Sequence, residues 1–295
     1  MPAVISASRR TDIPAFYGEW LLGRLRAGFV EVRNPYNPKQ VKRVSLRAQD
    51  VDCLVLWTKN PAPLAGRLDE LEKLCPRFYF QYTLNDYPRE LEPSLASAAE
   101  RIKTFTALAA RLGPERVVWR YDPVIVSSHT DAGYHRRVFA GLCDRLSGHT
   151  RRVMISLIDY YKKTEKNLLP LQQAGWLFDK QFANSGTARD LLAELASIAR
   201  KNSMAIFTCA EPGDYSDIGI SPGACVDGEL ITRLFGIVKK WKKDPGQRKH
   251  CRCAESRDIG AYDSCAHGCP YCYATRDAVK AREHRSNHDP GAEFL

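Results

Sequence analysis

Short runs of β-branched and aromatic residues alternate with longer stretches of helical spacing along most of this 295-residue chain. The short runs predict strands at 3–8, 28–33, 52–58, 78–83, 116–121, 152–158 and 204–209. The stretches between most of them predict helices, for example at 14–27, 94–112, 134–147, 187–202 and 227–243. Alternation of this kind indicates parallel strands joined by crossover helices, which is the α/β class.

The number of strands indicates one particular α/β architecture. Segment 256–262, SRDIGAY, offers an eighth strand, so we expect a single parallel (β/α) barrel of the TIM type, with a doubly wound open sheet as the alternative. No Pro/Gly/Ser-rich linker and no repeat divides the chain. We therefore expect one barrel domain over 1–285, which includes a cluster-binding segment at 251–276, and a C-terminal tail at 286–295.

Polar residues follow the predicted strands at their carboxyl ends, where barrels of this kind carry their functional groups. These residues are Ser8, Arg9, Arg10, Asp12, Arg33, Asn34, Thr58, Lys59, Asn60, Gln81, Thr83, Asn85, Arg120, Asp122, Ser156, Asp159, Cys209 and Glu211. Because they would converge on one rim, they predict a polar substrate pocket.

Composition and charge limit the location and the partners. Hydrophobic residues make up 44% of the chain, but no run approaches the roughly 20 apolar residues of a membrane span. Charge also follows the N-terminus too closely for a signal peptide, so we expect a cytoplasmic protein without membrane association. The formal net charge of +10 is compatible with nucleic acid or a phosphorylated metabolite as substrate. Part of this charge lies in 239–250, which we interpret as a solvated helix end.

Ten cysteines are distributed unevenly, with seven in the last third of the chain. In a reducing compartment, clustered thiols are more often metal ligands or redox groups than disulfides. Cys265, Cys269 and Cys272 have the spacing C-x3-C-x2-C, and their soft sulfur ligands select iron-sulfur clusters, zinc or copper(I). Zinc in a structural site would need a fourth ligand. An iron-sulfur cubane with three protein ligands keeps one iron open.

This loop, Cys265-x3-Cys269-Pro270-Tyr271-Cys272-Tyr273, resembles the cluster loop of the radical S-adenosylmethionine (SAM) superfamily. Nearly the whole chain also resembles an uncharacterised bacterial family, a domain of unknown function, whose C-terminal cysteines are described as similar to the radical SAM cluster. The segments that carry this second resemblance are ISASRRTDIPAFYG, VRNPYNPKQV, LWTKNP, WRYDP, TCAE and DIGAYDSCAHGCPYCYA.

The superfamily resemblance implies an enzyme with a [4Fe-4S] cluster whose open iron binds SAM. An electron from a donor such as flavodoxin or ferredoxin would cleave SAM reductively to methionine and a 5'-deoxyadenosyl radical, which takes hydrogen from a substrate. The protein would supply orientation, a dry pocket and control of the cluster's potential. The sequence identifies neither the substrate nor a catalytic residue.

The position of the loop departs from the superfamily pattern, in which the cysteines follow the first strand and not the last. If 256–262 pairs beside 3–8, the motif is permuted in sequence but not in space. Ser6, Ser8, Arg9 and Arg10 would then lie where superfamily members bind the SAM methionine group, although the usual glycine-glycine-glutamate motif is absent. Either arginine could bind the SAM carboxylate through two hydrogen bonds, or could instead pair with surface carboxylates such as Asp12 or Glu19.

Cys209, Cys225, Cys251 and Cys253 form a second set, with the number of thiols that a fully protein-ligated cluster requires. This set predicts a second iron-sulfur cluster or a structural zinc ion, and Cys209 could alternatively face substrate as a thiol. Two functions from other classes therefore remain beside the radical SAM enzyme. One is a zinc-stabilised nucleic-acid-binding protein, and the other is an iron-sulfur electron carrier or sensor without catalysis.

Overall fold

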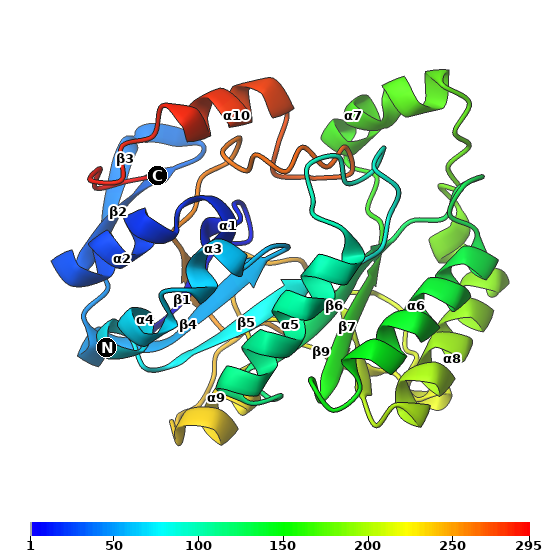
Figure 1. Ribbon diagram of the computed structural model, residues 1–295, viewed down its shortest axis with the longest axis horizontal. Coiled ribbons are helices and arrows are strands. Elements are labelled where there is room, and N and C mark those ends of the chain that lie inside the picture. Colours follow the sequence, from blue (N-terminus) through cyan, green and yellow to red (C-terminus); the bar gives the residue numbers. More distant parts are fainter. Residues whose placement is uncertain (1) are drawn as a thin grey trace.

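The computed structural model describes residues 2–295, and its core is one sheet of eight parallel strands in the order β10-β1-β4-β5-β6-β7-β8-β9 (Figure 1). The strands are β1 (Ala3–Ala7), β4 (Val51–Thr58), β5 (Phe78–Thr83), β6 (Val117–Val124), β7 (Arg152–Leu157), β8 (Ala205–Cys209), β9 (Ser221–Gly223) and β10 (Ser256–Asp258). Every pairing within the sheet is parallel. The α/β class expected from the sequence is confirmed.

The sheet does not form the closed ring that the number of strands suggested. Within residues 2–295, no strand pairing joins the two edge strands, β9 and β10. The intervening segment packs Val226, Leu230, Ile231 and Ala254 into the same buried cluster as Val4 of β1. Apolar side chains thus cover the open side of the sheet, so backbone pairing between the edge strands is not needed to exclude water there.

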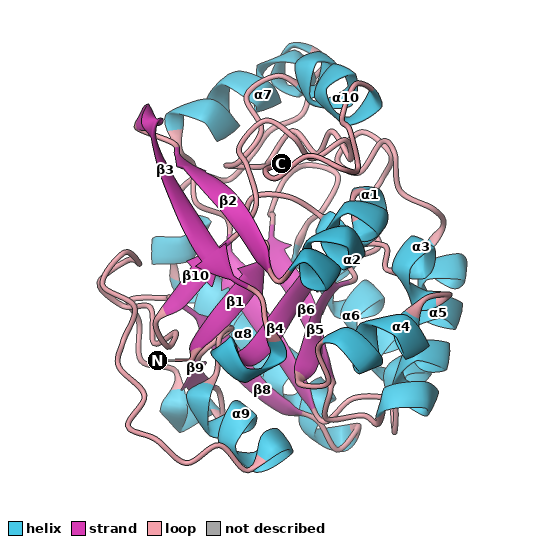
Figure 2. Ribbon diagram, turned by 90° about the vertical axis from the view of Figure 1, so that its left-hand side faces the viewer, coloured by secondary structure: helices cyan, strands magenta, loops and turns pink. Residues whose placement is uncertain are grey.

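The predicted strand at 28–33 forms, but its assignment to the main sheet was wrong. β2 (Phe29–Asn34) pairs antiparallel with β3 (Asn37–Ser45) in a separate two-stranded sheet (Figure 2). Only residues 35 and 36 separate the two strands, whereas a parallel crossover needs about a dozen residues or more. The eighth strand of the main sheet is instead β9, at the edge beside β8. Its three residues, SPG, carry no strand signal.

The helices are α1 (Ile13–Phe16), α2 (Gly18–Ala27), α3 (Ala62–Ala65), α4 (Leu68–Leu74), α5 (Ala98–Leu112), α6 (Ala132–Leu146), α7 (Lys162–Gln173), α8 (Gly186–Lys201), α9 (Gly228–Phe235) and α10 (Ala278–Ser286). Short 3₁₀ turns lie at Ala48–Asp50, Phe182–Asn184 and Ser216–Ile218. α5 begins at a capping box in which Ser97 and Glu100 bind each other's backbone N–H groups.

The predicted helix at 227–243 is much shorter than expected. α9 ends at Gly236, whose φ of 68° is left-handed and favours glycine. Residues 239–250 are therefore not a helix end, and Lys239 of this segment forms an ion pair with Asp52.

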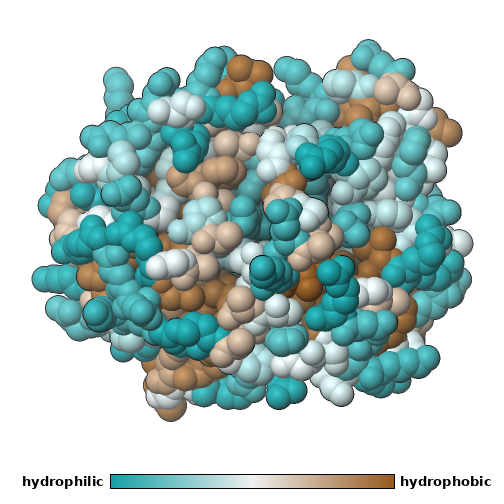
Figure 3. Space-filling model, in the orientation of Figure 1, coloured by the Kyte–Doolittle hydropathy of each residue, from teal (hydrophilic) through white to brown (hydrophobic). Residues whose placement is uncertain are grey.

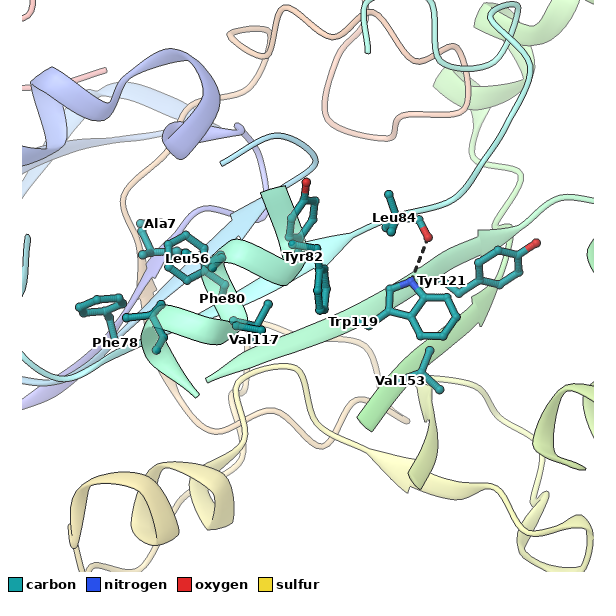
Figure 4. Close-up of a cluster of buried hydrophobic side chains, with 14 of the residues drawn as sticks. Ala7, Leu56, Phe78, Phe80, Tyr82, Leu84, Val117, Trp119, Tyr121 and Val153 are labelled. Atoms are coloured by element: carbon teal, nitrogen blue, oxygen red, sulfur yellow. Dashed lines mark hydrogen bonds between the residues drawn. The ribbon is translucent and has the colours of Figure 1, made fainter. Parts of the chain in front are cut away.

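Alternating side chains of the strands give the sheet two different faces. The outer face packs against the helices, as Trp119 does when it stacks on Phe139 of α6 with ring centroids 5.0 Å apart. Figure 4 shows part of this core, including the Trp119 indole N–H, which donates to the Leu84 carbonyl at 2.9 Å. The inner face is apolar near the amino ends of the strands and polar near their carboxyl ends, where Gln81 and Arg120 lie.

β10 lies beside β1, as expected, with Val4 paired to Ser256 and Ser6 to Asp258. The Asp258 carboxylate accepts hydrogen bonds from Ser6 Oγ at 2.9 Å, Ser8 Oγ at 2.7 Å and the Arg9 backbone N–H at 2.8 Å. Gly260 N–H donates to the same carboxylate at 3.1 Å. One carboxylate therefore fastens the C-terminal strand to the N-terminal strand.

The C-terminal residues pack against the rest of the chain. Trp20 Nε1 donates to the Ala292 carbonyl at 2.9 Å, and Glu31 N–H donates to the Glu293 carbonyl at 2.8 Å. Arg33 lies 3.9 Å from the centre of the Phe294 ring. The tail thus joins α2 to the β2–β3 hairpin, and Figure 1 shows the C-terminus beside that hairpin.

Hydrophilic residues predominate on the face shown in Figure 3, and hydrophobic surface is broken into separate patches. Among residues 2–295, no helix has both the length and the apolar character that a membrane span requires.

The close approach of Gly260 to β1 generates a first prediction. A Cβ at this position would stand 2.1 Å from Ser8 Oγ, so we expect Gly260→Ala to destabilise the fold by about 1–3 kcal/mol through overpacking. Gly141→Ala is the control, because a Cβ there meets nothing within 4 Å on α6 and should stabilise by roughly 0.5–1 kcal/mol. Urea unfolding of both variants measures the two shifts, and equal shifts would contradict the close approach.

Candidate functional site

A cavity of about 360 Å³ lies at the carboxyl ends of the strands. Its lining includes these predicted rim residues: Ser8, Arg9, Arg10, Asp12, Thr58, Lys59, Thr83, Arg120, Asp122, Ser156, Asp159 and Cys209. The other predicted rim residues are not among those that line it: Arg33, Asn34, Asn60, Gln81, Asn85 and Glu211. Arg33 and Asn34 are excluded because their strand belongs to the separate hairpin. The polar pocket expected from the strand ends is thus present, with a smaller set of residues.

Both sets of cysteines line this one cavity. The first set consists of Cys265, Cys269 and Cys272, and the second of Cys209, Cys225, Cys251 and Cys253. The remaining cysteines lie elsewhere, buried among apolar side chains: Cys53, Cys75 and Cys143. The fold therefore brings together seven thiols from both ends of the last third of the chain.

The loop that carries the first set is fastened to the start of the chain. Tyr17 OH donates to the Ser264 carbonyl at 2.7 Å, and Thr11 Oγ1 donates to the Ala261 carbonyl at 2.7 Å. Gly268 has a φ of 72°, a left-handed conformation that allows the turn between Cys265 and Cys269. Figure 1 shows this segment, in orange, crossing between α10 and α7.

A buried charge network lies beside Cys269. Lys59 Nζ donates to Glu92 Oε1 at 2.8 Å and to Tyr271 OH at 2.9 Å, and Tyr271 OH donates to Glu92 Oε1 at 2.6 Å. Arg101 Nη2 lies 3.4 Å from Glu92 Oε2. Burial works to lower the pKa of Lys59, but the charges of Glu92 and Cys269 raise it above its usual value. Burial raises the pKa of the Cys269 thiol to about 12, against the charge of Lys59.

His267, which lies within the cysteine loop, is engaged with a carboxylate. Its Nε2 lies 2.7 Å from Asp12 Oδ2, and its ring packs against Phe16 with centroids 4.6 Å apart. Asp12 also accepts the Ala15 N–H at 3.0 Å as the cap of α1, and the Lys59 N–H at 2.6 Å. The loop therefore presents three thiols to the cavity, while its histidine is held by Asp12.

The second set of cysteines forms a compact group at the inner face of the sheet. Cys209 Sγ and Cys225 Sγ are 2.9 Å apart, and Cys225, Cys251 and Cys253 lie in one buried cluster. The Val226 N–H donates to Cys253 Sγ at 3.3 Å. The four thiols that the sequence grouped are thus brought together from three segments of the chain.

Two arginines face this group. Arg120 Nη1 donates to Cys225 Sγ at 2.6 Å, and its Nη2 pairs with Asp122. The pKa of Arg9 is raised above its usual value. Burial works to lower this pKa, but the charges of Cys253 and Asp258 outweigh burial. The guanidinium carbons of Arg9 and Arg120 lie 5.3 Å and 5.1 Å from the centre of the Trp57 ring.

These contacts shift the pKa values of the four thiols in opposite directions. Hydrogen bonding from Cys225, reinforced by the charge of Arg120, lowers the pKa of Cys209 although the thiol is buried. Hydrogen bonds from Cys225 and Cys251 likewise lower the pKa of Cys253, with help from Arg9. The pKa values of Cys225 and Cys251 are raised by the same hydrogen bonds and by burial. The pKa values of the four thiols therefore diverge, with two below and two above the usual value for cysteine.

The predicted SAM-binding residues surround Asp258. Ser6 lies on β1 and Ser8 directly follows this strand. Both hydroxyls donate to that carboxylate, and Ser6 does not line the cavity. Arg9 donates from Nη1 to Ser256 Oγ at 3.2 Å. Arg10 Nε lies 3.9 Å from Asp258 Oδ1, and its Nη1 is 3.4 Å from the Gly260 carbonyl. These contacts are long, so the Arg10 guanidinium keeps donors for a ligand in the cavity.

Sequence reasoning missed several residues that organise the site. Glu92 lies in the irregular segment between β5 and α5 and belonged to no recognisable motif. Asp258 lay in a quoted motif and in a predicted strand, but it was given no role. Tyr79, which was missed, and the predicted rim residue Gln81 both donate to the Cys225 carbonyl, at 2.6 Å and 2.7 Å. Their position on the inner face of β5 was a usable signal, because residues two apart on a strand point the same way.

No ready-made site for a metal ion is present among residues 2–295, since no three or more His, Cys, Asp or Glu side chains stand in such an arrangement. This finding concerns ligands that converge on one ion. In a cubane cluster each thiolate binds a different iron, so its sulfurs stand further apart than the ligands of a single ion.

The fold and the cavity define an α/β protein with a parallel sheet and a cavity rich in thiols at the carboxyl ends of its strands. Residues 4–274 match the family described as Domain of unknown function (DUF1848), and the chain belongs to this family. This match confirms that the sequence motifs indicated an uncharacterised family. No curated protein and no solved structure matches the chain significantly.

The charge network beside Cys269 generates a second prediction. Glu92→Gln would leave Lys59 and Arg101 without their shared carboxylate, so we expect a loss of about 3–5 kcal/mol of stability at pH 7. Glu165→Gln is the control, because Glu165 pairs with Lys180 at the exposed surface, where such a pair contributes about 0–1 kcal/mol. Urea unfolding measures both effects.

Wild type and Glu92→Gln together also test the pH dependence of the stability. Burial alone would raise the pKa of Glu92, but Lys59, Arg101 and the Tyr271 hydroxyl together hold it below its usual value of 4.5. Its contribution is therefore complete above pH 4.5 and is lost as the pH falls through the folded-state value. We expect the difference between wild type and Glu92→Gln to shrink below pH 4.5. A difference that stays constant with pH would contradict an ionised Glu92.

Proposed function

We propose that this protein is a radical SAM-like enzyme that holds a [4Fe-4S] cluster through Cys265, Cys269 and Cys272. The observation that carries the proposal is the position of these thiols. The C-x3-C-x2-C loop follows a strand that lies beside β1 and opens onto a cavity at the carboxyl ends of a parallel sheet. This position supports a cluster loop that is permuted in the sequence but equivalent in space to that of the superfamily.

The donor set of the loop fits such a cluster. It offers three thiols, and the Nε2 atom of its one histidine, His267, is paired with Asp12 Oδ2. Three soft ligands without a fourth suit a cluster with an open iron better than a closed zinc site. When bound and reduced by a donor such as flavodoxin or ferredoxin, the cluster would cleave SAM to methionine and a 5'-deoxyadenosyl radical that abstracts hydrogen from the substrate.

The surroundings of the loop have two roles in this proposal. Lys59 places a positive charge beside Cys269, and this charge favours the thiolate form that binds iron. Tyr271 and Glu92 hold Lys59 in place through the hydrogen bonds described above. The apolar residues beneath them, Tyr87 and Leu91, bury this side of Cys269 and limit the access of water.

The Arg10 guanidinium is the group that we assign to the carboxylate of SAM. It lines the cavity together with Cys265 and Cys272, and its contacts to Asp258 and Gly260 are long. Arginine can bind a carboxylate through two parallel hydrogen bonds, which lysine cannot reproduce. Arg9 faces the second set of cysteines and is the less suitable of the two.

The cavity itself favours an enzyme over an electron carrier. Its volume of about 360 Å³ falls in the range of roughly 300–1,000 Å³ that is typical of small-molecule sites. An electron carrier without catalysis has no need of such a cavity. All ten cysteines are free thiols, which fits the reducing cytoplasm that we propose as the location.

The proposal predicts both the cofactor and its chemistry. Anaerobic reconstitution with iron and sulfide, followed by reduction in the presence of SAM, should yield 5'-deoxyadenosine. The variant with Cys265→Ala, Cys269→Ala and Cys272→Ala should lose about four irons per chain and all 5'-deoxyadenosine. Cys143→Ala is the control, because Cys143 is buried in the helical core away from the cavity. The proposal would be contradicted by an unchanged iron content in the triple variant. It would also be contradicted if reconstituted wild type, with its iron-sulfur cluster bound, did not cleave SAM.

The assignment of Arg10 predicts a specific loss of SAM affinity. A charge-assisted contact contributes about 1.5–3 kcal/mol, so Arg10→Lys should weaken SAM binding by about 10- to 150-fold while the cluster stays bound. Arg43→Lys is the control, since Arg43 pairs with Glu31 on the remote hairpin. Equilibrium binding of SAM to the reconstituted proteins measures the effect. If Arg10→Lys binds SAM as the control does, another group holds the carboxylate.

A further inference from the structure

We propose that Cys209, Cys225, Cys251 and Cys253 hold a thiophilic metal centre through four thiolates, with Arg9 and Arg120 as its counter-charges. This centre is separate from the loop of Cys265, Cys269 and Cys272, and the inference does not depend on the function proposed above. Zinc and an iron-sulfur cluster share the required chemistry, which is soft sulfur ligation.

The first support is the convergence of four thiols from separate parts of the chain. Cys209 ends β8, Cys225 follows β9, and Cys251 and Cys253 precede β10. Cys225, Cys251 and Cys253 are buried, and Cys209 is partly exposed toward the cavity. Packing alone does not require four buried thiols to adjoin each other, since thiols serve equally well as isolated small hydrophobic groups.

The spacing of the sulfurs is close to that of ligands around one ion. At a zinc–sulfur distance of about 2.3 Å, two thiolates of a tetrahedral site stand about 3.8 Å apart. Cys209 Sγ and Cys225 Sγ are 2.9 Å apart, a hydrogen-bonding contact that would have to widen by about 1 Å on binding. The described residues form no ready-made ion site, so the side chains would have to rotate on binding.

A disulfide accounts for the group less well. The 2.9 Å contact between Cys209 and Cys225 is longer than the roughly 2.05 Å of a sulfur–sulfur bond. A disulfide between Cys209 and Cys225 would also leave the adjacent thiols of Cys251 and Cys253 unexplained.

Charge gives the second, independent support. Four thiolates around a divalent ion carry a net charge of about −2, which burial makes unfavourable unless cations lie nearby. Arg120 donates directly to Cys225 Sγ, and Arg9 lines the same cavity as the four thiols. The Arg9 Nη2 atom is buried and has no hydrogen-bond partner. An anionic centre beside it would supply the missing acceptor.

The inference is tested in a protein that lacks the first set of thiols. The background variant carries Cys265→Ala, Cys269→Ala and Cys272→Ala, so any metal that it retains belongs elsewhere. We expect the anaerobically purified background to hold about one zinc ion, or about four irons with sulfide, per chain. Elemental analysis with a sulfide assay distinguishes the two metals, and either result supports the inference.

Two further variants locate the metal in the background protein. Adding Cys225→Ser and Cys253→Ser should remove the metal, whereas adding Cys143→Ser, the control in α6, should leave it in place. Retention of the metal after the Cys225→Ser and Cys253→Ser changes would overturn the inference. So would a background protein that is folded by circular dichroism but holds no zinc or iron.

A cobalt titration keeps the test decisive if the added serine variants do not fold. The metal-free background should take up about one cobalt(II) ion and develop the visible absorption of a tetrahedral tetrathiolate site. Cobalt uptake without the sulfur-to-cobalt charge-transfer band would show that the four thiols are not the ligands. This measurement does not involve SAM, so its failure is distinct from a failure of the proposed enzyme activity.

Discussion

The carboxylate of Asp258 joins β1, the first strand in the sequence, to β10, the last, and the placement of the cysteine loop depends on this junction. An ionised carboxylate only accepts hydrogen bonds, and Asp258 meets donors from Ser6, Ser8, Arg9 and Gly260. These bonds fix the register of a three-residue strand that could not hold its position by backbone pairing alone. The loop that follows is thereby set over the carboxyl ends of the strands, where the other polar side chains of the cavity converge.

Local patterns in the sequence predicted the elements better than the connections between them. Continuous apolar runs such as 78–83 marked buried parallel strands, and the exposed glycine at position 236 explains why α9 ends before the basic segment. Alternation at 28–33 marked a strand, but its partner, β3, was not predicted as a strand, so the hairpin was missed although only two residues separate its strands. The cysteines were found by their spacing and residue type. The roles of Glu92 and Asp258 were not, because a single carboxylate acquires a role only when the fold supplies its partners.

The two groups of thiols share a cavity but have different electrostatic surroundings. Cys269 lies beside Lys59, whose charge is shared with Glu92, so the net charge on that side is small. Around Cys225 and Cys253, Arg120 and Arg9 contribute positive charge, and Asp122 and Asp258 lie beside them. The first group of thiols therefore faces one lysine, and the second group faces two arginines.

The pairing of the first strand with the last also orders events during synthesis. Ser6 of β1 leaves the ribosome 252 residues before its partner, Asp258 of β10. At roughly 5–20 residues per second, β1 waits about 10–50 s with one edge unpaired. β4 can pair with the other edge of β1 much sooner. A nascent chain would therefore expose the unpaired edge of β1 until β10 emerges. Cys265, Cys269 and Cys272 follow β10 in the sequence, so the cavity acquires its full set of thiols only when β10 is available to complete the sheet.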